Sequence, residues 1–62
     1  MSTDKLLLSV PEAAGRLSIG RAALYDLIRT NRLRTVKIGR RRLVPVAALA
    51  EAIALLEEET AV

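Results

Sequence analysis

Nine basic side chains lie between residues 16 and 42, and they are the groups of this chain best suited to binding a charged ligand. Asp26 is the one acid in that window, which therefore carries a formal charge of +8, whereas residues 1–15 carry −1 and residues 43–62 carry −4. Eight of the nine are arginines, whose planar guanidinium groups form paired hydrogen bonds with phosphate oxygens and with guanine edges. A basic surface backed by an acidic C-terminal part predicts a polyanionic partner.

The composition argues against catalysis and against a metal site. The 62 residues include no Cys and no His, so disulfides and the usual transition-metal ligands are excluded. Without these residue types a general base near neutral pH or a strong nucleophile is hard to supply, and the acids form no plausible catalytic pair. We therefore expect a non-enzymatic protein with no metal and no cofactor.

The length and hydropathy predict one small domain away from membranes. A chain of 62 residues buries only about 60% of its unfolded surface, so its stability is expected to be marginal. No apolar run approaches the roughly 18 residues of a membrane span, and the segment 6–8 is too short for a signal-peptide core. The expected location is the cytoplasm.

Two short helices are predicted in the first half of the chain. Ser9 and Glu12 form a capping box, and an apolar stripe then extends to a helix end near Ser18, because Gly20 interrupts the pattern. A second helix is predicted from about Arg21 to Thr30, with Asn31 as a left-handed C-terminal cap. The inner stripe of this helix consists of Leu24, Leu27 and Ile28. Its outward face carries Arg21, Tyr25 and Arg29.

A basic hairpin and a third helix are predicted in the second half. The segments 34–38 and 41–44 read as strands joined by a two-residue turn at Gly39 and Arg40, and Pro45 is expected to open a helix that ends at about Glu58. The predicted fold is mainly α with a small β-hairpin wing, a winged helix-turn-helix with three helices. The domain is expected to cover residues 5–58, after a disordered segment 1–4 and before a tail 59–62.

This order of elements predicts which residues contact DNA. The second helix of a helix-turn-helix unit lies in the major groove, and an arginine-rich wing suits a minor groove or its flanking phosphates. Tyr25 has the alternative of covering the edge of the core, and Asp26 is expected to pair with Arg29 or Arg32. The candidate DNA-binding residues are Arg21, Ala22, Tyr25, Arg29, Arg32, Lys37, Arg40, Arg41 and Arg42.

The third helix is apolar almost all round. Its expected inward residues are Val46, Leu49, Ile53 and Leu56. A second strip of Ala48, Ala52 and Leu55 then points elsewhere, which predicts a contact with another protein. The alternative is that the alanines only favour helix and that Leu55 is a single exposed residue.

Several segments together resemble the excisionase-type helix-turn-helix domains, which are related to the DNA-binding domain of MerR regulators. The matching segments are LLSVPEAAGRL (7–17), LYDLI (24–28), VKIGRR (36–41) and VP (44–45), so the resemblance covers about residues 6–56. It implies a bacterial phage or integrated-element protein that binds repeated DNA sites, bends the DNA and directs an integrase toward excision, with head-to-tail self-association on DNA. It also implies that Arg21, Ala22 and Tyr25 enter the major groove and that Arg40 and Arg41 contact the backbone or the minor groove.

Two positions depart from the family pattern. Gly20 stands where the family often has a Ser or Thr cap, and Arg42 stands where it favours an aromatic residue, so the faces of that strand stay open. The competing functions are a small transcription regulator of the same fold and, from another class, a protein-interaction module with an acidic partner. RNA binding is less favoured, because Tyr25 is the only aromatic residue available for stacking on unpaired bases.

Overall fold

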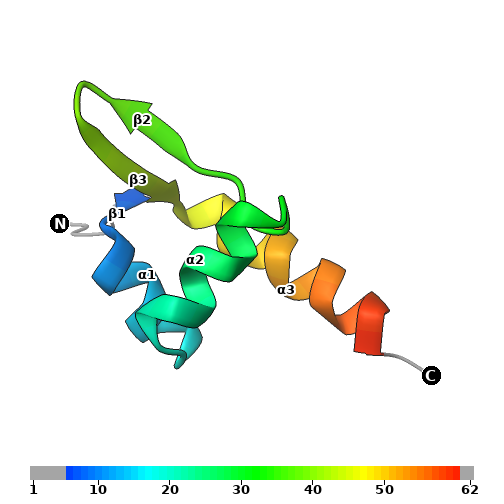
Figure 1. Ribbon diagram of the computed structural model, residues 1–62. Coiled ribbons are helices and arrows are strands. Elements are labelled where there is room, and N and C mark those ends of the chain that lie inside the picture. The colour runs from blue at the N-terminus through cyan, green and yellow to red at the C-terminus, as the bar shows by residue number, and fades with distance from the viewer. Residues whose placement is uncertain (1–5, 61–62) are drawn as a thin grey trace, which may run out of the picture.

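The computed structural model, which describes residues 6–60, consists of three helices and a small antiparallel sheet (Figure 1). This arrangement is the winged helix-turn-helix that the sequence predicts. Within residues 6–60, no helix is long and apolar enough to cross a membrane. The elements in chain order are β1 (Leu7–Leu8), α1 (Val10–Leu17), α2 (Arg21–Arg29), β2 (Val36–Ile38), β3 (Arg41–Pro45) and α3 (Val46–Thr60).

The sheet has the order β1-β3-β2, so β3 lies between the N-terminal strand and the outer strand of the hairpin. Leu8 pairs with Val44 in the core, and Lys37 pairs with Arg42 in the hairpin. Gly39 has a φ of +61°, a conformation that suits glycine, at the predicted two-residue turn. The hairpin of β2 and β3 projects at one end of the molecule, and the C-terminal end of α3 lies at the other (Figure 1).

Helix α1 begins with the predicted capping box. Its end near Ser18 is also as expected, but Gly20 is not its cause. Ser9 Oγ accepts from the Glu12 backbone N–H, and Glu12 Oε1 accepts from the Ser9 backbone N–H. The helix ends because Ser18 adopts the left-handed conformation (φ 59°, ψ 41°). Gly20 is instead the extended N-cap of α2.

The core combines residues from every helix with the sheet. Its largest fully buried side chains are Leu8, Leu24, Leu33 and Val44. Leu33 lies between α2 and β2, where no periodic pattern marked it as a core residue. Its backbone N–H donates to the Leu27 carbonyl at 3.0 Å, and Asn31 turns the chain there with a φ of +63°.

Helix α3 begins and ends at other residues than expected. Pro45 does not open the helix: it is the last residue of β3 and pairs with Leu7. The helix also continues through Glu59 and Thr60, two of the four residues expected in the tail. The N-terminal segment 1–4 and residues 61–62 lie outside the described part of the chain.

The faces of α3 also differ from the expected ones. Ala48 and Ala52 are only 1% and 0% exposed and belong to the domain's own core, so the expected outward strip does not exist. Ile53, expected to point inward, is 45% exposed. Small side chains are buried here because the helix packs closely against the rest of the core.

Candidate nucleic-acid interface

Helix α2 presents an exposed face on the side away from the core. Leu24 is completely buried and fixes the orientation of the helix. Arg21 and Tyr25, one turn apart, therefore share the outward face, with Ala22 beside them. All three are exposed, and Tyr25 is 47% exposed.

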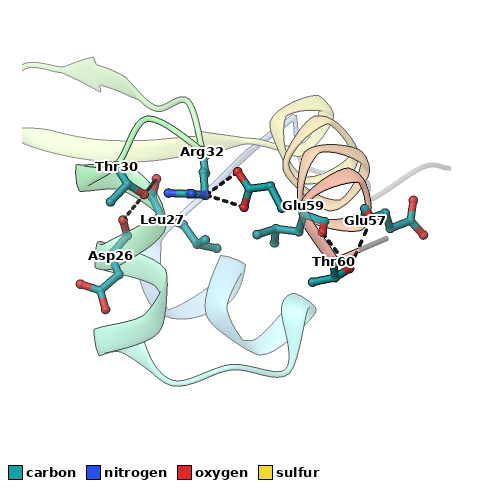
Figure 2. A network of polar contacts seen from close by, with 8 residues as sticks. Asp26, Leu27, Thr30, Arg32, Glu57, Glu59 and Thr60 are labelled. Atoms are coloured by element: carbon teal, nitrogen blue, oxygen red, sulfur yellow. Dashed lines mark hydrogen bonds and ion pairs between the residues drawn. The ribbon is translucent and has the colours of Figure 1, made fainter. Parts of the chain in front are cut away.

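The two arginines of α2 differ in that only Arg29 forms an ion pair with Asp26. The Asp26 carboxylate forms this ion pair with Arg29, three residues along the helix, as the sequence predicts. The Thr30 hydroxyl donates to the Asp26 carbonyl at 2.7 Å and closes the end of the helix (Figure 2). Arg21 has no acidic partner among residues 6–60, so the start of α2 is the more available of the two ends for a phosphate or a base.

The wing places like charges directly opposite each other. Lys37 on β2 faces Arg42 on β3 across the antiparallel ladder. Since like charges at directly opposed positions destabilise a sheet, a nearby polyanion would relieve this repulsion. Within the described residues none of the wing cations forms an ion pair with a carboxylate. They are Lys37, Arg40, Arg41 and Arg42.

Strand alternation settles the faces of β3 that the sequence left open. Arg42 and Val44 lie two residues apart and so point to the same side of the sheet, which is the core side because Val44 is fully buried. Arg42 itself is exposed, because the hairpin extends beyond the core. Arg41 lies on the opposite side, with Val36 and Ile38 across the ladder. The wing therefore carries cations on both faces.

Unlike the cations of the wing, the two arginines of the loop between α2 and β2 each bind a carboxylate of α3. Arg32 Nε donates to both carboxylate oxygens of Glu59 at 2.8 and 2.9 Å (Figure 2). Arg34 binds Glu51 through Nε and Nη2 at 3.0 and 2.9 Å. Arg32, expected to contact the DNA backbone, is thus engaged by α3.

These two ion pairs shift the pKa of Arg32, Arg34 and Glu51. The hydrogen bonds that Arg32 and Arg34 donate to Glu59 and Glu51 raise the pKa of both arginines above the usual range of arginine. The hydrogen bond from Arg34 lowers the pKa of Glu51 below its usual value of 4.5. No local pattern signals either pair, because the partners lie 27 and 17 residues apart in the chain.

Comparison with known proteins assigns this arrangement to a family. The family model described as "Helix-turn-helix domain" matches residues 7–54. A protein named "Excisionase" from Streptomyces ambofaciens is 51% identical over 47 residues, which cover 76% of each chain. A "Probable excisionase" from Saccharopolyspora erythraea is 39% identical over 46 residues, which are 74% of this chain and 47% of that protein. No solved structure matches significantly.

Proposed function

Because this chain belongs to the excisionase-type helix-turn-helix family, we propose that it binds repeated sites on duplex DNA and directs a site-specific integrase toward excision. Members of this family bind DNA and are not themselves enzymes, so DNA binding is the activity of the domain. The proposal adds three points to DNA binding itself: the sites are repeated, the DNA is bent, and an integrase is the partner. A DNA-associated location in the cytoplasm of a bacterial host follows from the same proposal.

The observation that best supports a DNA contact at the wing is the opposition of Lys37 and Arg42. A pairing that costs stability in the free domain becomes favourable beside phosphates, because counterions are released when lysines and arginines neutralise the DNA backbone. Within residues 6–60 no carboxylate forms an ion pair with a wing cation, so the charge of the wing is not neutralised by the domain itself.

In the proposed complex α2 lies in the major groove with its N-terminal residues at the base edges. Arg21 contacts a guanine or a phosphate, Ala22 allows a close approach of the backbone, and the Tyr25 hydroxyl donates to a phosphate. The wing follows the backbone or enters the adjacent minor groove through Arg40 and Arg41. Arg29 and Arg32 contribute only where a phosphate replaces Asp26 or Glu59.

Footprinting on duplexes that this protein selects from a random pool tests the proposal. We expect several direct repeats in helical phase, and a mobility change that depends on site position because the DNA is bent. Head-to-tail assembly along the DNA would protect these repeats cooperatively. A single inverted repeat would instead indicate a two-fold dimer and the transcription regulator, and no enriched sequence would contradict specific recognition.

The salt dependence of binding provides a second test. Roughly five to seven phosphate contacts should give a log–log slope of about −0.9 per contact on duplex DNA. A protein-interaction module with an acidic partner would bind duplex DNA weakly and without sequence preference.

A further inference from the structure

An open apolar groove lies on the side of the domain formed by the three helices. Its floor and walls are Leu17 at the end of α1, Ile19 in the turn before α2, Leu27 on α2, and Ile53 and Leu56 on α3. The hollow measures about 260 Å³. This is below the roughly 300–1,000 Å³ of small-molecule pockets, so it suits a few side chains of a larger partner.

The domain itself does not fill this groove. The buried residues of α3 are Ala48, Leu49 and Ala52, all in its first half. The second half continues for two more turns beside the groove, and Ile53 remains 45% exposed. The Arg32 Nε–H, which donates to both carboxylate oxygens of Glu59, ties this part of α3 to the loop after α2 and holds the groove wall in place (Figure 2).

The charge at the groove disfavours DNA and favours a cationic partner. Of the residues that line it, Glu57 is the one charged side chain, and Glu58 follows it on the exposed surface of α3. Carboxylates at this position repel phosphates and attract lysine or arginine. The acidic rim is therefore complementary to basic residues that flank an apolar surface.

The walls of the groove also restrict the shape of the partner. The lining residues come from helices and a turn, so the groove offers no strand edge to which an extended peptide could add. Aliphatic side chains between helices are the usual receptor for the apolar face of an amphipathic helix. We propose that this groove docks a basic amphipathic α-helix of a partner protein, with its aliphatic side chains on Ile53 and Leu56 and its basic residues on Glu57.

A pair of designed helical peptides tests the proposal with the intact chain. The first carries leucines at positions i, i+3, i+4 and i+7 and lysines at the flanks of this stripe. The second has glutamate in place of every lysine. We expect the lysine peptide to bind at least about tenfold more tightly in fluorescence anisotropy.

Two matched pairs of variants locate the binding. Ile53→Glu should weaken binding of the lysine peptide by about tenfold or more, whereas Leu55→Glu, exposed on the same helix but outside the groove, should change it less than about twofold. Glu57→Lys should likewise weaken binding more than Glu58→Lys. Duplex DNA binding by Ile53→Glu and Leu55→Glu should be unchanged, which shows that both fold and separates this test from that of the proposed function.

Three results of the peptide experiments would overturn the proposal. They are the absence of binding by the lysine peptide, equal binding of the two peptides, and equal losses from Ile53→Glu and Leu55→Glu. Self-association of the wild-type chain in sedimentation experiments, abolished by Ile53→Glu but not by Leu55→Glu, would assign the groove to a second copy and would also overturn it.

Discussion

The wing and the loop between α2 and β2 are both rich in basic residues, but only the loop arginines form ion pairs with carboxylates of the described residues. In the loop, Arg34 forms a bidentate ion pair with Glu51, and the Arg32 Nε–H donates to both carboxylate oxygens of Glu59. In the wing, Lys37 and Arg42 face each other with no carboxylate partner in the described part of the chain. Net charge alone therefore overstates the DNA-binding surface, because part of it is neutralised within the domain.

The largest loss of DNA binding is expected when the unpaired arginine of α2 is replaced, and a much smaller loss when a paired arginine of the loop is replaced. Arg21→Ala should cost about 1–3 kcal/mol of DNA-binding free energy if Arg21 reads a base. Arg34→Ala should cost much less, because Glu51 already binds its guanidinium group. Anisotropy titrations on the selected site measure both, and equal losses would break the distinction between the two regions.

A smaller effect is expected from the opposed cations of the wing. Lys37→Gln removes a like-charge pair and should stabilise the free domain by roughly 0.2–1 kcal/mol, while it weakens DNA binding. Thermal or denaturant unfolding measures the gain, which should nearly vanish in 1 M salt because the Debye length is then about 3 Å. A loss of stability would show that repulsion between Lys37 and Arg42 does not destabilise the free domain.

The ion pair between the loop and α3 should contribute less. Its two side chains are 36% and 38% exposed, so solvent screens their attraction, and holding both long side chains in one geometry costs conformational entropy. A double-mutant cycle of Arg32→Ala and Glu59→Ala measures the coupling. Glu59→Gln should leave DNA affinity unchanged or raise it slightly, with Glu58→Gln as the control. A clear loss of affinity with Glu59→Gln would indicate that the pair positions the interface.

The smallest effect is the pH dependence of the Glu51 pair. The folded pKa of Glu51 lies below 4.5, so in the folded state this carboxyl binds its proton less readily than in the unfolded chain. Its contribution to stability is therefore fully present above about pH 4.5 and is lost as the pH falls through the lowered pKa. Wild type and Glu51→Gln should differ in unfolding free energy near pH 7 and converge in acid. An equal difference at both ends of this range would contradict the role of the carboxylate.

Local patterns in the sequence were sufficient for the elements and for their order. The capping box at Ser9 and Glu12, the pairing of Asp26 with Arg29, the left-handed Asn31 and the turn at Gly39 all depend on residues within a few positions of each other. Such interactions are determined by backbone geometry that the residue types themselves impose. The resemblance to excisionases depended on these same segments, and the family is confirmed.

The tertiary structure alone decided which faces are covered and which charges are neutralised. A helix as uniformly apolar as α3 carries no periodic signal for its inner face, so the burial of Ala48 and Ala52 and the exposure of Ile53 could not be predicted. The burial of Leu33 and the pairs of Arg32 with Glu59 and Arg34 with Glu51 join segments far apart in the chain. Contacts of this kind depend on how the helices and the sheet pack together, and that packing brings side chains together irrespective of their separation in sequence.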